Sequence, residues 1–185
     1  GLYLHLNPLQ EAVHPEGDTD FTRIAERIGE VAESLEVPVL VKEVGAGISA
    51  ADAELLVAQG VRYIDVAGAG GTSWSRVEHH RQPETTGHDL GRLFQDWGLP
   101  TPEALRALAP CRDRVTLVAS GGIRSGLDMA KAIILGASLC GVAAPFLKPA
   151  MESVEEVVQV IERFKQELVT AMFLLGARTV SDLLG

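Results

Sequence analysis

Five short aliphatic runs, each followed by a polar or glycine-rich stretch, constrain the fold more than any other feature of this chain. They predict strands at Leu2–Leu6, Val39–Val44, Tyr63–Ala67, Val115–Ser120 and Leu139–Ala143. Longer segments with helical periodicity separate the runs, which is the pattern of repeated βα units in a parallel sheet. Each run is largely apolar, as expected of strands that are covered on both faces. The chain is therefore predicted to be an α/β protein with a parallel sheet.

The residues that begin and end the intervening segments predict the helix boundaries. The predicted helices are Phe21–Leu35, Ala50–Gln59, Pro102–Ala109, Gly126–Leu135, about Ser153 to Leu175, and a short one at Ser181–Leu184. Thr101 and Ser49 are predicted to cap the helices that follow them. Gly60 and Gly136 are predicted to end helices in a left-handed conformation before the next strand.

The placement of polar residues favours a barrel over an open sheet. Polar or glycine residues follow the carboxyl end of all five predicted strands. A (β/α)8 barrel gathers its active site there, whereas an open doubly wound sheet needs such residues at one crevice. A complete barrel takes about 250 residues. Residues 1–185 are therefore predicted to be the C-terminal portion of a single TIM-barrel domain, roughly five βα units, with the N-terminal portion absent.

Charge and composition exclude several classes of partner. The formal net charge of −9 and a pI near 5.0 argue against a nucleic-acid surface, which needs a basic face. The apolar runs are too short to cross a bilayer, and no secretory signal begins the chain. Cys111 and Cys140 fit no metal spacing and are expected to be reduced, so the default localisation is cytoplasmic.

A glycine-rich segment after the fourth predicted strand suits an anion. Ser120-Gly-Gly-Ile-Arg-Ser-Gly-Leu-Asp begins at a strand end and opens a helix, so its backbone N–H groups and the helix dipole can face a phosphate. Its glycine spacing is neither that of a dinucleotide fingerprint nor that of a Walker loop. The stretch Gly141-Val-Ala-Ala-Pro-Phe ends the next strand, and consecutive loops of this kind form the usual barrel phosphate site. The alternative is a pair of tight turns selected for packing.

Two other strand ends carry candidate ligand contacts. Lys42 ends an apolar strand, where a partly buried ammonium needs a partner such as an anionic flavin ring or a phosphate. The alternative is a structural salt bridge with a neighbouring carboxylate such as Asp65. After Asp65, three glycines let the backbone lie against a flat ligand, and Thr72 can donate a hydrogen bond to it. The alternative for that loop is ordinary turn composition.

The segment His5-Leu-Asn-Pro-Leu-Gln-Glu places four functional side chains at one strand end. Glu11 can hold Mg²⁺ together with substrate phosphate oxygens, and His5 and Asn7 can donate hydrogen bonds to the same phosphate. Gln10 can place a substrate carbon or relay a water. The alternatives are a barrel-interior histidine, an Asn7-Pro8 turn and a solvated helix-start carboxylate.

A connection of more than thirty residues between Ala67 and Pro102 is predicted to be a functional or mobile loop. Its histidines, His79, His80 and His88, lack metal-ligand spacing with a matching partner. They are predicted to be exposed loop residues.

Six segments of the chain resemble type 2 isopentenyl-diphosphate isomerase, an FMN-dependent barrel enzyme of isoprenoid biosynthesis. They are HLNPLQE (His5 to Glu11), PEGDTDF (Pro15 to Phe21), VKEVGAGIS (Val41 to Ser49), DVAGAGGTSW (Asp65 to Trp74), DWGLPT (Asp96 to Thr101) and SGGIR (Ser120 to Arg124). The resemblance covers nearly all of the chain. SGGIRSG and the valine-lysine strand recur across flavin barrels and would alone indicate only FMN.

The resemblance implies a set of site residues. FMN would be contacted by Lys42, Thr72, Gly122, Ile123, Arg124, Ala143 and Ala144, the last five around its phosphate. Gln10 would touch the isoprenoid substrate at the reacting centre, Glu11 would bind Mg²⁺, and His5 and Asn7 would help hold the diphosphate.

The resemblance also implies the reaction and the assembly. Isopentenyl and dimethylallyl diphosphate would interconvert by a 1,3-allylic proton shift, with reduced FMN, maintained by NADPH, supplying the acid-base group. Family members form tetramers or larger assemblies, so a homo-oligomer is expected. The alternatives are an FMN-dependent 2-hydroxy-acid oxidase, which would need a catalytic histidine, and a non-catalytic phosphate-ligand-binding protein.

Overall fold

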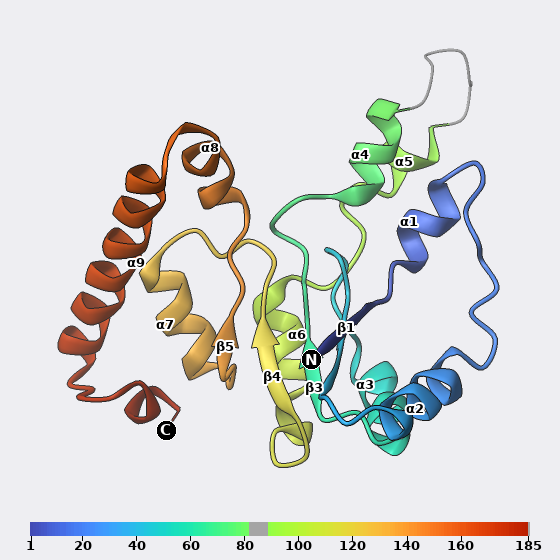
Figure 1. Ribbon diagram of the computed structural model, residues 1–185, viewed down its shortest axis with the longest axis horizontal. Coiled ribbons are helices and arrows are strands. Elements are labelled where there is room, and N and C mark those ends of the chain that lie inside the picture. Colours follow the sequence, from blue (N-terminus) through green and yellow to red (C-terminus); the bar gives the residue numbers. More distant parts are fainter. Residues whose placement is uncertain (82–88, 185) are drawn as a thin grey trace.

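The computed structural model describes residues 1–81 and 89–184 and shows one parallel sheet in the order β1-β2-β3-β4-β5 (Figure 1). The strands are β1 (Leu2–His5), β2 (Val39–Lys42), β3 (Tyr63–Asp65), β4 (Thr116–Ala119) and β5 (Leu139–Cys140). Each strand ends one to three residues earlier than predicted. Sequential strands pair in parallel, as the alternation predicted, and together with the helices they form five consecutive units of a (β/α)8 barrel.

Helices follow every strand. They are α1 (Pro8–Val13), α2 (Ile24–Ser34), α3 (Ala50–Ala58), α4 (Trp74–Arg81), α5 (Leu90–Leu93), α6 (Thr101–Ala107), η1 (Ala109–Cys111), α7 (Gly126–Ile134), α8 (Ala144–Glu152), α9 (Val154–Leu175) and η2 (Val180–Leu183). Helices α2, α3, α6, α7 and α9 confirm the prediction, and the expected last helix is a 3₁₀ turn. Helices α1, α4, α5 and α8 were not predicted, because they are short and polar or contain proline. None of the described helices has the length and apolarity that a bilayer crossing requires.

Two of the predicted helix boundaries need comment. The hydroxyl of Ser49 accepts the N–H of Asp52 at 3.2 Å, so the cap predicted there is confirmed. Thr101 is not a cap, because it is the first residue of α6; its hydroxyl donates instead to the carbonyls of Ser120 at 2.9 Å and Gly121 at 2.7 Å. This side chain therefore ties α6 to the loop after β4.

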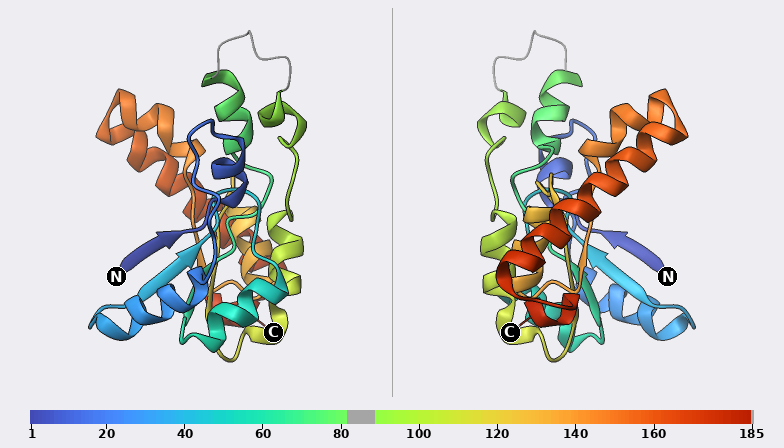
Figure 2. Two further views of the ribbon diagram at one scale, coloured as in Figure 1. Left: turned by 90° about the vertical axis from the view of Figure 1, so that its right-hand side faces the viewer. Right: turned by 90° about the vertical axis from the view of Figure 1, so that its left-hand side faces the viewer.

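The main core lies between the outer face of the sheet and helices α2, α3, α6 and α7. Alternate strand residues point into it, and its largest fully buried side chains include Ile48, Ile64, Leu105, Leu108 and Leu117. Helix α9 packs against α7 and α8 at one flank of the sheet (Figure 2). The opposite sheet face carries polar residues, and Tyr3 on it is 49% exposed. The inner face and the carboxyl edge of the sheet are therefore the parts that carry exposed polar side chains.

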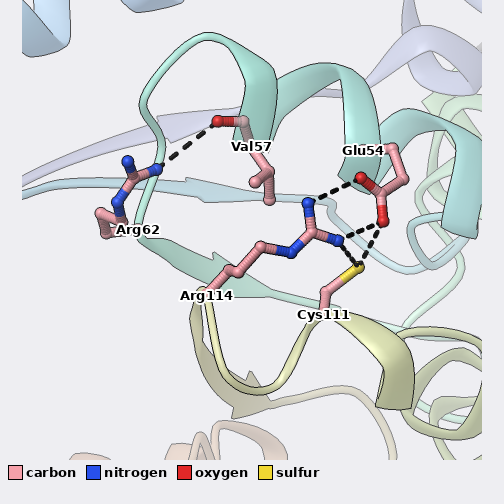
Figure 3. A network of polar contacts seen from close by, with 5 residues as sticks. All are labelled: Glu54, Val57, Arg62, Cys111 and Arg114. Atoms are coloured by element: carbon pink, nitrogen blue, oxygen red, sulfur yellow. Dashed lines mark hydrogen bonds and ion pairs between the residues drawn. The ribbon is translucent and has the colours of Figure 1, made fainter.

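A polar network at the amino end of the sheet belongs to the scaffold (Figure 3). Arg114 donates to both carboxylate oxygens of Glu54 on α3, and the Cys111 thiol donates to the same carboxylate at 3.3 Å. The hydrogen bond from Arg114 lowers the pKa of Glu54, whereas burial raises the pKa of Cys111. Arg62 donates to the carbonyl of Val57 at 3.5 Å. These contacts join α3 to the segments that enter β3 and β4.

Candidate active site

The loops after β3 and β4 pack directly on each other. The N–H of Gly68 donates to the carbonyl of Ser120 at 3.1 Å, and Arg124 Nη2 donates to the carbonyl of Gly70 at 2.9 Å. A Cβ on Gly71 would lie only 2.9 Å from the nitrogen of Gly122. The two loops therefore form one surface, and the Arg124 side chain bridges it.

Free backbone donors face outward from the loop after β4. Among the described residues, the N–H groups of Gly121, Gly122 and Ile123 donate to no protein acceptor. Gly121 and Gly122 have φ values of 89° and 78°, and α7 begins a few residues further on, with Ser125 as its cap. Successive amides of this kind at a helix start form an anion-binding concavity. The geometry fits the phosphate of FMN.

The predicted partner loop after β5 lies beside this concavity. The N–H of Gly141 donates to the carbonyl of Ala119 at 2.8 Å, and a Cβ on Gly141 would lie 2.9 Å from the Cβ of Ser120. Ala143 and Ala144 follow and are both exposed; Ala143 precedes α8, and Ala144 is its first residue. The structure therefore brings the two predicted phosphate-binding stretches together at one edge of the sheet.

The strand ends of β1, β2 and β3 place three polar side chains in one row. His5 pairs with Lys42, and Lys42 pairs with Asp65, in the register of the sheet. The alternative salt bridge is wrong, because in the described chain Lys42 forms no ion pair with Asp65 and its Nζ donates to the carbonyl of Glu43 at 2.5 Å. The ammonium therefore has no carboxylate partner there and suits an anionic ligand.

Asp65 is a buried structural carboxylate. Its Oδ1 accepts the hydroxyl of Ser120 at 2.7 Å and the N–H of Ala67 at 3.1 Å. Burial raises the pKa of Asp65, and these hydrogen bonds together with the charge of Lys42 oppose that rise. The Asp65 carboxylate thus fixes the starts of the loops after β3 and β4. Thr72 lies further along the loop after β3 and is exposed to solvent.

Glu11 lies on α1 and is held in place by two donors. Asn7 Nδ2 donates to its Oε1 at 2.7 Å, and the N–H of Asp18 donates to its Oε2 at 2.9 Å. In the part of the chain that the structure describes, no group of three or more His, Cys, Asp or Glu side chains could enclose a metal ion. Mg²⁺ is typically held by one or two carboxylates with phosphate oxygens and waters. Glu11 is a single carboxylate of the kind that Mg²⁺ accepts as one of its ligands.

Sequence reasoning missed one residue of this site, Glu78. Gln10 Nε2 donates to Glu78 Oε1 at 2.9 Å, and Arg81 lies 3.2 Å from the same oxygen. Glu78 is 1% exposed. The connection was predicted to be a loop, but α4 places Glu78 facing Gln10. The i, i+3 spacing of Glu78 and Arg81 suits a helix and could have indicated α4, but it does not link Glu78 to Gln10.

The structure also corrects the prediction for the histidines. His79 and His80 lie in α4 rather than in a loop, and His79 is half-buried with its Nδ1 2.5 Å from a carboxylate oxygen of Asp89. His80 is exposed, as predicted. His88 lies outside the described residues.

A cleft runs beside Gln10. Its lining comes from α1, the turn after β2, the start of α4 and the segment before α6: Leu9, Gln10, Glu43, Val44, Gly45, Ala46, Ser73, Trp74, Ser75 and Trp97. Half of this lining is apolar or aromatic, and Gln10, Glu43, Ser73 and Ser75 add polar groups. The cleft has a volume of only about 20 Å³, so it marks a small hollow of mixed polarity beside Gln10.

Comparison with known proteins identifies related sequences. Residues 9–184 match the FMN-dependent dehydrogenase family. A protein of Hydrogenovibrio crunogenus called isopentenyl-diphosphate delta-isomerase is 52% identical over 98% of this chain and 53% of its own length. One of the same name from Paracoccus zeaxanthinifaciens is 57% identical over 99% of this chain and 53% of its own. The chain thus spans about half the length of these curated relatives.

Solved structures share the fold. A mutant flavocytochrome b2 with benzoylformate superposes with a TM-score of 0.64 at 23% identity, over 85% of this chain and 36% of that one. A mandelate oxidase with (S)-4-hydroxymandelic acid superposes with a TM-score of 0.58 at 27% identity, over 86% of this chain and 39% of that one.

Proposed function

The chain belongs to the FMN-dependent dehydrogenase family, and from that premise we propose that it forms part of the active site of an isopentenyl-diphosphate delta-isomerase of the FMN-dependent type. Relatives with that name are 52% and 57% identical to it, whereas the mandelate oxidase is 27% identical. This difference favours the isomerase over the 2-hydroxy-acid oxidase. We further propose that residues 1–185 are the C-terminal portion of a single barrel domain.

One observation carries the proposal: the Gln10 and Glu11 pair lies at the same edge of the sheet as a phosphate-binding concavity. Gln10 lies beside the apolar side chains of Leu9, Trp74 and Trp97, and the adjacent Glu11 carboxylate suits Mg²⁺. An allylic diphosphate combines a short hydrocarbon, which apolar side chains can contact, with a charged headgroup, which Mg²⁺ can neutralise. A 2-hydroxy acid has no group that would need the Glu11 site.

For the cofactor, we assign the FMN phosphate to Gly122, Ile123, Arg124, Ala143 and Ala144, and the remaining contacts to Lys42 and Thr72. The free amides after β4 provide donors for the phosphate, and Lys42 provides a positive charge close to the strand ends. When bound and reduced by NADPH, FMN supplies the acid-base group for the proton shift.

The protein's own groups position the substrate. Glu11, with Mg²⁺, neutralises diphosphate charge, and His5 with Asn7 donates hydrogen bonds to the same headgroup. Asn7 also donates to Glu11 at 2.7 Å, so it orients the metal-binding carboxylate. Gln10 contacts the reacting carbons, and its hydrogen bond to Glu78 fixes the orientation of its amide.

Further proposals concern the environment of the protein. We propose a homo-oligomer of tetrameric or larger size in the cytoplasm, acting on a small isoprenoid diphosphate. The net charge of −9 argues against a nucleic-acid partner.

The test is turnover by the purified full-length protein. Isopentenyl diphosphate is incubated anaerobically with FMN, NADPH and MgCl2, and dimethylallyl diphosphate is quantified. The proposal expects turnover that needs the flavin and Mg²⁺. A protein that binds FMN but oxidises 2-hydroxy acids instead would contradict the isomerase assignment, and one that binds no FMN would contradict the site.

A further inference from the structure

Glu43 is a buried carboxylate that the proposed chemistry does not use. It follows Lys42 at the end of β2 and is 3% exposed. Its Oε2 accepts three successive backbone N–H groups, those of Val44 at 2.5 Å, Gly45 at 2.7 Å and Ala46 at 2.5 Å. One oxygen atom therefore sets the conformation of the whole turn.

The second oxygen of Glu43 is free. Within the described structure, Oε1 is buried and has no hydrogen-bond partner, and Glu43 lines the cleft beside Gln10. Burial raises the pKa of Glu43, and the three backbone hydrogen bonds only partly oppose the rise. A buried polar atom without a partner is costly, and here the three hydrogen bonds of Oε2, which hold the turn, offset that cost.

The turn that Glu43 holds is packed against the proposed flavin loop. A Cβ on Gly45 would lie 2.8 Å from the carbonyl oxygen of Thr72. The carbonyl oxygen of Ala46 accepts a hydrogen bond from the N–H of Leu99 at 2.8 Å. The turn therefore packs against both the loop after β3 and the segment before α6, so a shift of the turn would displace both segments.

We propose that Glu43 is a positioning residue for FMN: by holding the turn 44–46, it fixes the backbone against which the Thr72 loop rests. This inference rests on the proposed flavin site. In this role Glu43 acts through Gly45 and Thr72 rather than by binding the cofactor itself.

The free oxygen makes a specific prediction about substitutions. In Glu43→Gln, the amide oxygen can accept the same three N–H groups. The amide nitrogen takes the place of Oε1, and no hydrogen bond is lost there, because Oε1 accepts none from the described chain. Glu43→Gln should therefore retain the turn. Glu43→Ala removes the acceptor and leaves three amides unpaired.

The experiment uses the full-length protein, stripped of flavin and titrated with FMN, as wild type and as the Glu43→Ala and Glu43→Gln variants. Glu36→Gln is the matched control, since Glu36 is an exposed carboxylate before the amino end of β2. Dissociation constants come from quenching of FMN fluorescence. Visible circular dichroism at saturating FMN reports the flavin environment, and hydrogen–deuterium exchange reports the amides of residues 44–46.

We expect Glu43→Ala to weaken FMN binding about tenfold, which is the effect of one hydrogen bond lost between the displaced Thr72 loop and the charged cofactor. Hydrogen exchange at residues 44–46 should become faster, and the visible circular dichroism spectrum should change. Glu43→Gln should bind within about threefold of wild type, and Glu36→Gln should match wild type. Unchanged FMN affinity and spectrum in Glu43→Ala, despite faster exchange, would overturn the inference.

A second variant tests the same inference if the Glu43→Ala protein does not fold. Gly45→Ala leaves the Glu43 carboxylate in place but directs a methyl group at the Thr72 carbonyl, so it should weaken FMN binding; unchanged affinity would overturn the inference. Isomerase activity is measured separately. A wild-type protein that binds FMN without isomerising refutes the proposed function and leaves the Glu43 test intact, whereas one that binds no FMN refutes both.

Discussion

Adding one methyl group at Gly121 tests the packing of the two loops that form the phosphate concavity. Gly121 has a φ of 89°, and a Cβ there would lie 2.1 Å from the carbonyl oxygen and 2.9 Å from the nitrogen of Gly68. Gly60 is the matched control, because its φ is 86° and a Cβ there would meet nothing within 4 Å. The two alanine variants share the backbone strain and differ only in the steric overlap.

The expected losses of unfolding free energy follow from these distances. Gly60→Ala should cost about 1–2 kcal/mol, the cost of a left-handed residue with a Cβ. Gly121→Ala adds an overlap with backbone atoms that cannot rotate away, and overpacking of this kind costs about 1–3 kcal/mol more. The total for Gly121→Ala is therefore about 2–5 kcal/mol.

Urea-induced unfolding of both variants, followed by circular dichroism, measures the difference, and FMN titration measures the functional effect. Gly121→Ala should be less stable than Gly60→Ala by at least about 1 kcal/mol and should bind FMN more weakly, whereas Gly60→Ala should bind FMN as wild type does. Equal losses in the two variants, with FMN affinity intact in Gly121→Ala, would refute the close contact between the loops.

Three further predictions concern single side chains. Glu11→Ala should abolish turnover without changing FMN affinity, and raising the Mg²⁺ concentration should not restore it; substantial activity would exclude Glu11 as the metal ligand. Glu78→Ala should lower kcat about 10- to 100-fold, because it removes the acceptor that orients Gln10; steady-state assays in which only KM changes would contradict that role. Burial raises the pKa of the Cys140 thiol from 9.0 to about 11, so near pH 8 the folded protein holds about 100-fold less thiolate there than the unfolded chain. Iodoacetamide should modify Cys140 slowly until urea unfolds the protein, and the rate should rise with pH up to about 11; rapid labelling of the native protein would show that the thiol is not buried.

The sequence was sufficient for the sheet because the strand signals are local. Apolar runs such as Val39–Lys42 alternate with helical periodicity, and the βα pattern determines parallel pairing without further information. Strand ends were predicted too late because the turn residues after them are themselves apolar. Val44, for example, is a good strand residue, but its N–H bonds to the Glu43 carboxylate instead of a neighbouring strand.

The candidate site was only partly predictable, for a physical reason. Residues at strand ends, such as Lys42 and Gly122, could be placed because parallel strands bring their carboxyl ends to one edge. Glu78 could not, because it is 68 residues from its partner Gln10 and is oriented by a short polar helix with little periodic signal. The role of Thr101 was mistaken for a similar reason, since its hydroxyl bonds to the distant loop after β4 rather than to its own helix.

The most direct test of the proposed activity is to incubate isopentenyl diphosphate with the full-length protein, reduced FMN and Mg²⁺ in D2O and to follow the products by NMR. The account predicts dimethylallyl diphosphate that carries solvent deuterium at an allylic carbon, with no net consumption of NADPH beyond the initial reduction of the flavin. Absence of both isomerisation and deuterium exchange, in a protein that holds reduced FMN, would contradict the account.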